Sequence, residues 1–126
     1  MSKPAVAILG ASSDPSKFGN KSVRAHAKAG FEVFPINPKG GEIEGLQVYT
    51  SLAEVPVEHL RRISVYLPPA VGLTMLDEIA AKKSDEVWFN PGSDSPAILS
   101  KCRALGIKAI ADCSIVALGL SPAQFP

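Results

Sequence analysis

Two serines and a lysine follow a short apolar run near the start of the sequence, in the stretch PAVAILGASSDPSKFG. The run Ala5–Leu9 has the length of a buried strand, and the residues after the lysine have the pattern of a helix. A strand-to-helix turn offers backbone N–H groups and the partial positive charge of a helix start to an anion. With the hydroxyls of Ser12 and Ser13 and the charge of Lys17, the stretch predicts a phosphate or pyrophosphate site. The alternative is a capped turn with a solvated lysine.

This turn differs from the two common phosphate-binding motifs. In the dinucleotide fingerprint GxGxxG, a second glycine follows two positions after the first. Here Gly10 is followed by Ala11 and two serines, and the next glycine is Gly19. The P-loop requires Ser or Thr after its lysine, whereas Phe18 follows Lys17. The stretch therefore predicts an anion site of another type.

A second cation, Lys39, follows the next strand-like run in the sequence FEVFPINPKGG. Proteins that bind NAD usually carry an acidic residue at this strand end, where it accepts a hydrogen bond from the ribose 2′-hydroxyl. The sequence Asn37-Pro38-Lys39 offers a positive charge instead, which favours a ligand with a phosphate on its ribose. Such a ligand is NADP-like or coenzyme A-like, since coenzyme A carries a ribose 3′-phosphate and a pyrophosphate. The alternative is a solvated lysine in a glycine-rich loop.

Strand-like and helix-like segments alternate along the chain. Strands are predicted at residues 5–9, 31–36, 46–49, 63–67, 86–89 and 107–111. Helices are predicted from residue 18 or 19 to 29, over 70–83 and over 96–105, with a helical turn after Ser51. Strands separated by helices form parallel βαβ units with right-handed crossovers. We therefore expect one domain over 1–126, a three-layer, doubly wound, Rossmann-like α/β fold with a mostly parallel sheet.

The residues that follow the predicted strands are rich in Gly, Pro, Ser and Asn. These exits are residues 10–13, 37–41, 68–69, 90–93 and 112–114. Parallel strands end at the same edge of a sheet, where open α/β folds bind their ligands. The exits therefore predict a cleft for a flat or extended ligand, with ordinary turn chemistry as the alternative.

Composition limits the classes of function. The chain has 126 residues, a formal net charge of +1 and 20% charged residues, so bulk charge favours neither nucleic acid nor a membrane surface as a partner. No apolar run approaches the ~18 residues of a membrane span, and the N-terminus does not resemble a signal peptide. Two cysteines without a CxxC spacing suggest a reducing compartment. These features predict a cytoplasmic protein.

No group of residues has the spacing of catalytic or metal-binding machinery, so we predict neither a catalytic residue nor a metal site. Cys102 shares a helix face with Ile98 and Leu105, which indicates a core position. Cys113 follows a strand and could approach the cleft. The basic residues of the first helix, Lys21, Arg24 and Lys28, are interpreted as a solvated face.

Longer stretches of the sequence resemble the CoA-binding domain family, small stand-alone proteins similar to the N-terminal Rossmann-like domain of the succinyl-CoA synthetase alpha subunit. The resemblance runs from about residue 4 to 118 through GASSDPSKFGNKSVRAHAKAGFEVFPINPKGGEIEGLQVYTSLAEVP, SVYLPP and WFNPGSDSP. Its most specific parts are the G-A-S-x-x-P-x-K-x-G opening and the N-P-K exit.

The resemblance implies a role for each strand exit. Residues at the pyrophosphate would be Gly10, Ala11, Ser12, Ser13 and Lys17, and those at the 3′-phosphate Asn37, Pro38 and Lys39. Residues bordering the adenine and the pantetheine arm would be Leu67, Pro68 and Pro69, and those on the far side of the cleft Asn90, Pro91 and Gly92. Cys113 would then have a minor alternative role, a mixed disulfide with the CoA thiol.

The resemblance also implies a second domain with a phosphorylated histidine in the synthetase alpha subunit, which we do not expect in a sequence of 126 residues. We interpret His26 and His59 as surface or partly buried residues rather than catalysts. The leading hypothesis is a protein that binds coenzyme A or an acyl-CoA without catalytic machinery of its own, as a carrier, a sensor or the partner of an enzyme. A homodimer is a further possibility. The alternatives are an NADP-dependent reductase, with Lys39 at the 2′-phosphate, and a regulatory module with a degenerate nucleotide site.

Overall fold

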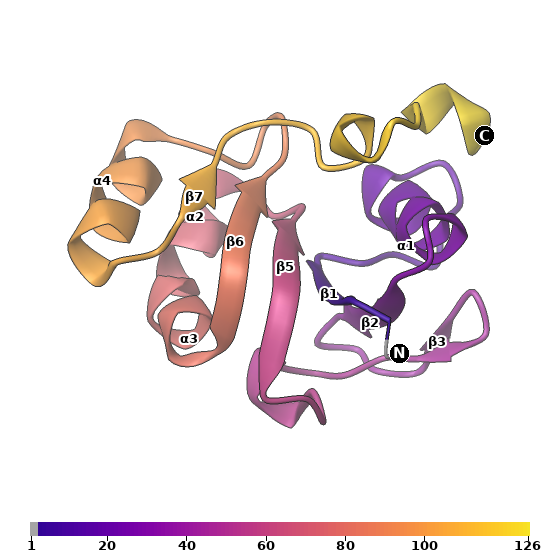
Figure 1. Ribbon diagram of the computed structural model, residues 1–126, viewed down its shortest axis with the longest axis horizontal. Helices are drawn as coiled ribbons and strands as arrows, with labels where there is room; N and C mark the ends of the chain where they lie inside the picture. Colours follow the sequence, from indigo (N-terminus) through magenta and orange to yellow (C-terminus); the bar gives the residue numbers. More distant parts are fainter. Residues whose placement is uncertain (1–2) are drawn as a thin grey trace.

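The computed structural model describes residues 3–126, which form a five-stranded parallel sheet in the order β2-β1-β5-β6-β7 (Figure 1). Its strands are β1 (Ala5–Leu9), β2 (Glu32–Ile36), β5 (His59–Val65), β6 (Lys83–Phe89) and β7 (Ala109–Ile110). The helices are α1 (Phe18–Lys28), α2 (Pro69–Thr74), α3 (Leu76–Ala81) and α4 (Pro96–Leu105). Short 3-10 turns are η1 (Leu52–Glu54), η2 (Val116–Leu118) and η3 (Pro122–Gln124). No helix in this range has the length and apolarity to cross a membrane.

Two hydrophobic cores lie on the two faces of the sheet. On one face, α1 packs through Val23 against Val6, Ile8 and Val33. On the other, the helices α3 and α4 contribute Leu76, Ile79, Ile98 and Cys102 to a larger core with β1 and β5. The sheet therefore lies between two helical layers, which confirms the predicted three-layer, mostly parallel Rossmann-like domain.

A hairpin that the sequence patterns did not predict joins β2 to η1. Its strands β3 (Glu42–Ile43) and β4 (Leu46–Gln47) pair antiparallel. The two residues between them, Glu44 and Gly45, both have positive φ, 51° and 76°. This conformation belongs to the tight turns whose twist matches that of a hairpin. The strand predicted over 46–49 is confirmed only at Leu46–Gln47, and β3 was not predicted because a two-residue strand is too short for a hydrophobic alternation to reveal.

Several predicted boundaries are wrong: β5 ends at Val65 rather than 67, β6 begins at Lys83 rather than 86, and β7 spans only Ala109–Ile110 of the predicted 107–111. The helix expected over 70–83 is divided at Met75 into α2 and α3, and Lys83 already belongs to β6. Gly72 and Thr74, which have low helix propensity, precede the break. The strand expected to begin at residue 63 begins at His59. The prediction missed this start because the first residues of β5 are mostly polar and charged.

Arg24 of α1 is not a solvated residue, so the interpretation of a fully solvated basic face is wrong at this position. Its Nη2 donates to the carbonyl oxygens of Pro15 and Phe125, at 2.8 and 3.0 Å, and its Nε donates to Asn20 Oδ1 at 2.8 Å. The guanidinium also lies over the Phe125 ring. Arg24 thus fastens the C-terminal end of the chain to α1. Leu105 similarly differs from its expected core position, since it is exposed.

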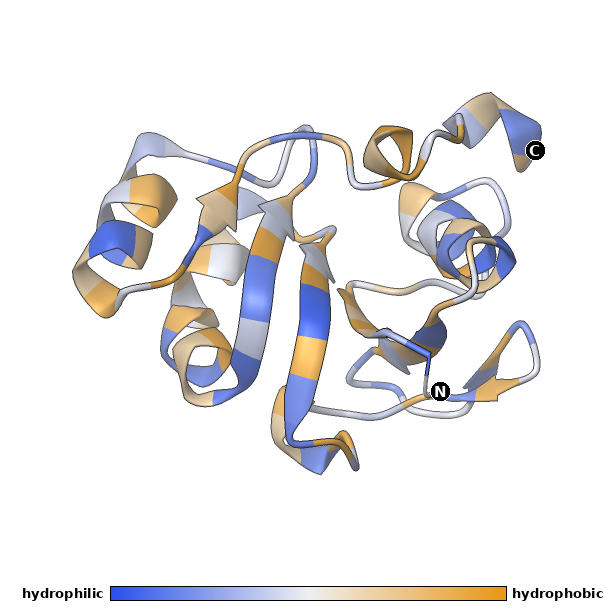
Figure 2. Ribbon diagram, in the orientation of Figure 1, coloured by the Kyte–Doolittle hydropathy of each residue, from blue (hydrophilic) through white to orange (hydrophobic). Residues whose placement is uncertain are grey.

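A polar layer is buried between the sheet and α1. In Figure 2 the strands β5 and β6 carry hydrophilic segments among the hydrophobic ones. Arg62 of β5 is buried and donates from Nε to Glu86 Oε1 at 3.2 Å. Its Nη1 lies 3.3 Å from Nε2 of His26, and His26 Nδ1 lies 2.8 Å from the carbonyl oxygen of Ser22. His26 is fully buried, contrary to the sequence-based expectation.

These contacts define the protonation state of His26. The carbonyl of Ser22 can only accept, so Nδ1 carries the proton, and Nε2 accepts from Arg62. Burial lowers the pKa of His26 from 6.5 to about 4, and the charge of Arg62 acts in the same direction. The folded protein therefore holds this imidazole neutral.

We expect the free energy of unfolding to fall as the pH decreases from about 6.5 towards 4. The folded-state pKa lies below the unfolded value, so the stabilisation is complete above pH 6.5 and is lost as the pH approaches 4. The loss attributable to His26 is about 2 kcal/mol between pH 7 and 5. Urea unfolding at several pH values measures it. His26→Gln should flatten the dependence in this window, and His59→Gln, at an exposed site, is the control. An unchanged slope in His26→Gln would refute the assignment.

Candidate functional site

The crevice of the sheet lies between the carboxyl ends of β1 and β5, where the chain connections diverge. β1 leads through α1 to β2 on one side, and β5 leads through α2 and α3 to β6 on the other. This reversal of strand order is the position at which open α/β sheets bind ligands. Residues 10–13, which follow β1, and residues 66–68, which follow β5, flank this position and are called its two walls below.

The first residue of the β1 exit, Gly10, permits a very close approach of the two walls. Its φ is +85°, and a Cβ atom there would overlap the carbonyl oxygen of Tyr66 and lie 2.9 Å from its carbonyl carbon. The N–H groups of Gly10 and Ala11 both donate to the carbonyl oxygen of Ile36, at 3.3 and 3.2 Å. These two N–H groups are therefore committed within the protein, and the donors for an anion begin at Ser12.

A second close approach involves Gly19, in the first turn of α1. A Cβ atom at Gly19 would overlap the carbonyl oxygen of Gly10 and lie 3.3 Å from the Cα of Ala11. Glycine thus lets the start of α1 rest directly on the β1 exit. In the dinucleotide fingerprint the third glycine serves close helix–strand packing, and Gly19 does so here at a different spacing.

Two buried or half-buried amides orient the loop after β1. Asn20 Nδ2 donates to the carbonyl oxygen of Ser12, and Asn37 Nδ2 donates to that of Ala11, both at 2.9 Å. Carbonyl oxygens repel an anion, and these bonds occupy them. The bond of Asn37 also joins the β2 exit to the β1 exit, as expected for one rim.

The start of α1 has no side-chain cap. Its N-cap residue is Lys17, which makes no capping hydrogen bond, and its first turn holds no acidic residue. Upstream, Asp14 accepts from the N–H and hydroxyl of Ser16, at 3.0 and 2.7 Å, and these bonds lower the pKa of its carboxyl group. An uncapped helix start beside exposed serine and lysine residues is suited to accept an anion.

The β2 exit forms a tight turn around Asn37. Asn37 Oδ1 accepts from the N–H of Lys39 at 2.9 Å, and its carbonyl oxygen accepts from the N–H of Gly40 at 3.0 Å. Lys39 is exposed and forms no ion pair within residues 3–126. Its charge is therefore available at the rim.

A small cavity of about 100 Å³ adjoins the crevice, lined by Phe18, Tyr66, Asn90, Pro91 and Cys113. Asn90 forms a fixed wall, because its Nδ2 donates to Ser64 Oγ and the carbonyl of Val65, and its Oδ1 accepts from the N–H of Ser114 at 2.8 Å. Burial raises the pKa of the Tyr66 phenol, which lies 3.2 Å from Ser114 Oγ.

The sequence patterns placed Asn90, Pro91, Cys113 and Ser114 near the cleft but missed Phe18 and Tyr66. Ser114 belongs to the segment after β7, which crosses the carboxyl edge of the sheet towards α1 (Figure 1). Its role depends on contacts with residues more than twenty positions away. Tyr66 could have been recognised as the first residue beyond a strand at the switch point. Phe18 is 58% exposed, and such exposure of a large apolar side chain is not visible in the sequence.

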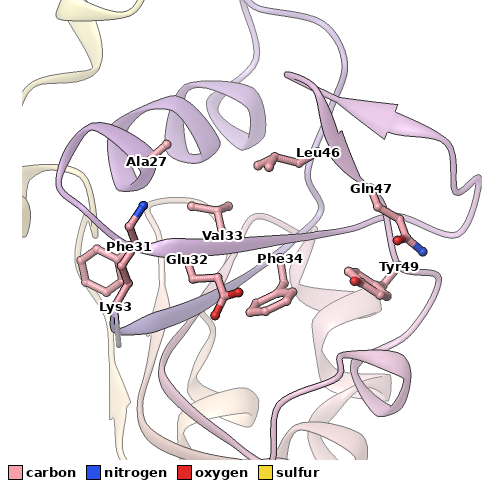
Figure 3. Close-up of a pocket in the computed structure, with 9 residues that line it drawn as sticks. All are labelled: Lys3, Ala27, Phe31, Glu32, Val33, Phe34, Leu46, Gln47 and Tyr49. Carbon is pink, nitrogen blue, oxygen red and sulfur yellow. The ribbon is translucent and has the colours of Figure 1, made fainter. Parts of the chain in front are cut away.

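A larger hollow lies elsewhere, at the outer edge of β2 (Figure 3). It measures about 690 Å³ and is open, lying between β2, the last turn of α1 and β4. Phe31, Phe34 and Tyr49 line it, and none of the predicted site residues does. It is bordered by the side of an edge strand rather than by strand exits, so it is distinct from the crevice.

The parallel sheet between helical layers, with its strand order reversing between β1 and β5, defines a Rossmann-like domain. The model of the CoA binding domain family matches residues 4–119, and the chain belongs to this family. This confirms the resemblance found in the sequence.

Curated relatives include two alpha subunits of ADP-forming acetate–CoA ligase from Pyrococcus furiosus. Subunit I is 41% identical over 59 residues, which cover 42% of this chain and 13% of the relative. Subunit II is 36% identical over 56 residues, which cover 42% of this chain and 12% of the relative. The matched region therefore spans only about an eighth of these relatives.

Solved structures share the fold. A conserved hypothetical protein from Pyrococcus furiosus has a TM-score of 0.83 and 35% identity, over 90% of this chain and 98% of that chain. The dinucleotide-forming acetyl-coenzyme A synthetase 1 of Ca. Korarchaeum cryptofilum, in complex with phosphate and ADP, has a TM-score of 0.74 and 24% identity. That match covers 86% of this chain and 25% of the synthetase, and it shows the fold alone.

Proposed function

We propose that the protein binds coenzyme A or an acyl-CoA in the crevice between the exits of β1 and β5. The observation that carries the proposal is the uncapped start of α1, held against the β1 exit by Gly19 and flanked by Ser12, Ser13 and Lys17. Membership of the CoA-binding domain family supports it. A pyrophosphate would receive the N–H groups and hydroxyls of the two serines and the charge of Lys17.

The other strand exits would accommodate the rest of the ligand. Lys39, in the turn built on Asn37 and Pro38, would bind the ribose 3′-phosphate. The exit at Leu67, Pro68 and Pro69 would contact the adenine and the first part of the pantetheine arm. Asn90, Pro91 and Gly92 would line the far side of the cleft. The small cavity beside Asn90 lies at the end of this path.

We further propose that the protein acts with a CoA-using enzyme carried on another chain, as a carrier, a sensor or a subunit. The relatives named above are alpha subunits of a ligase, which supports an enzyme partner. Cys113 lines the small cavity, and its N–H donates to Asp112 Oδ1. Within residues 3–126, no hydrogen bond joins its thiol to a histidine or lysine that could act as a base.

Isothermal titration of the purified protein with CoA and with NADPH tests the proposal. We expect a micromolar Kd for CoA, about −8 kcal/mol, and no measurable binding of NADPH. Binding of NADPH alone would favour a reductase. If neither CoA nor NADPH binds, the assignment of the crevice as a CoA site is contradicted.

Lys39→Ala should weaken the binding of CoA by about tenfold and leave that of 3′-dephospho-CoA unchanged. The variant removes one charge-assisted contact to the 3′-phosphate, an interaction of about 1–2 kcal/mol at a solvated rim. Titration of both ligands into the variant measures the difference. Lys28→Ala, at an exposed position in the last turn of α1, is the matched control. An equal loss for both ligands would show that Lys39 does not recognise this phosphate.

A further inference from the structure

One edge of the sheet carries unpaired backbone groups. β7 is last in the strand order and pairs only with β6 (Figure 1). The N–H of Val87 in β6 donates to the carbonyl oxygen of Lys108 at 2.9 Å, so Lys108 and Ile110 direct their backbone groups towards β6. Ala109 and Ala111 therefore direct theirs outwards. Among residues 3–126, no other segment forms a backbone hydrogen bond with these outward groups.

The opposite edge of the sheet, formed by β2, is protected, unlike the edge formed by β7. The carbonyl of Pro35 in β2 accepts from the N–H of Tyr49, and the N–H of Asn37 donates to the carbonyl of Tyr49. Pro35 itself offers no N–H. Proline and a covering segment are common means of blocking a sheet edge. The edge of β7 has neither, and free edges bind extended chains.

A groove runs along this free edge. A hollow of about 420 Å³ lies beside β7, with Leu99, Ile107 and Ala109 among its apolar residues and Arg103 and Lys108 as its cations. A second hollow of about 310 Å³ shares Ile107 and Lys108 and extends to Lys83 and the exposed Leu105. The groove therefore combines apolar side chains with positive charge.

The apolar side chains of this edge and Lys108 lie on different faces. Ile107 and Ala109 pack against the core on the side of α4. Because side chains alternate along an extended chain, Lys108, which lies between them, points to the opposite face. A strand added to β7 would alternate in the same way, with apolar side chains towards α4 and acidic ones towards Lys108.

The charges that line the groove indicate which kind of partner it binds. Lys83, Arg103 and Lys108 form no ion pair within the described residues. The one acidic residue lining the groove, Asp85, is already bonded to His59 at 2.8 Å and lies 3.5 Å from Arg61. A second copy of this chain would bring like charges together, which is unfavourable. We propose that the free edge of β7 binds an extended, acidic segment of a partner protein as an additional strand.

A titration followed by NMR amide shifts tests this interaction on the full chain. The probe is a capped peptide of alternating valine and glutamate with the length of a typical strand, about five to six residues. Binding should shift the amide signals of Ala109 and Ala111. A glutamate-only peptide of the same length should bind at least about tenfold more weakly, because it lacks the apolar side chains.

Ala109→Pro is the sharpest variant, because it removes only an outward N–H group and leaves the hydrogen bonds to β6 in place. It should weaken binding of the alternating peptide at least about tenfold, as should Lys108→Glu. Lys28→Glu makes the same change of charge on α1 and should bind normally. The proposal is overturned if the wild-type chain does not bind the alternating peptide, or if the glutamate-only peptide binds equally well. It is also overturned if the chain dimerises through this edge, or if a DNA oligonucleotide displaces the peptide at equal concentration.

Discussion

Gly19→Ala should lower the free energy of unfolding by about 3 kcal/mol and weaken CoA binding at least about tenfold. The added methyl group would overlap the carbonyl oxygen of Gly10, a backbone atom that cannot rotate away as a side chain can. Relief requires the start of α1 to move away from the β1 exit. That movement separates the helix N–H groups from Ser12 and Ser13, so the proposed pyrophosphate site is lost together with stability.

Urea unfolding and titration with CoA measure both effects. Gly72→Ala is the matched control, since Gly72 is also helical and a Cβ atom there would lie 3.5 Å from Ile98 Cδ1, an ordinary contact. Alanine is the better helix former, so this control should be neutral or slightly stabilising. If Gly19→Ala and Gly72→Ala had the same stability, the close contact between α1 and the β1 exit would be incorrect.

The parts of the fold that were predictable depend on local patterns. The apolar run of β1 and the helix over 96–105 were identified, and α4 has these bounds, with Ser95 Oγ accepting from the N–H of Ile98 at its start. Gly106, with a positive φ of 73°, follows its last residue. Each signal requires only a few neighbouring residues, and the alternation of strands and helices then determines a parallel sheet.

Features that depend on distant residues were not predictable. The charged start of β5 reads as a loop, because the partners of Arg62 are Glu86 on the next strand and His26 on α1. The split between α2 and α3 is marked in the sequence only by the low helix propensity of Gly72 and Thr74, a weaker signal than a proline. For β5, tertiary contacts override the local pattern.

The candidate site was predictable in part for the same reason. The exits at Gly10 and Asn37 are marked by glycine, proline and asparagine, and the bond from Asn37 Nδ2 to Ala11 O joins them. The buried amide and hydroxyl that fix the cavity wall, Asn90 and Ser114, meet across 24 sequence positions. The sequence therefore shows which exits gather at one edge of the sheet, whereas the rigidity of the candidate site comes from pairings that the sequence does not display.

Arg62→Met should lower the free energy of unfolding by about 3–4 kcal/mol. The guanidinium is bonded to Glu86, lies over the rings of Trp88 and Phe31, and donates to the carbonyl oxygen of Ser114 at 3.4 Å. Methionine retains apolar volume but leaves the carboxylate of Glu86, whose side chain is 20% exposed, without its cation. Breaking one partner of a buried pair in this way costs more than the pair contributes.

The double variant Arg62→Met, Glu86→Gln separates charge from packing. Glutamine keeps an oxygen to accept the bond from Trp88 Nε1 but carries no charge, so it should restore about 1–2 kcal/mol relative to Arg62→Met alone. Urea unfolding of the wild type, the two single variants and the double variant completes the cycle. No recovery in the double variant would mean that Arg62 acts through ring stacking and the bond to Ser114. In that case Arg62 would stabilise the fold by holding the segment that carries Cys113 over the carboxyl edge of the sheet.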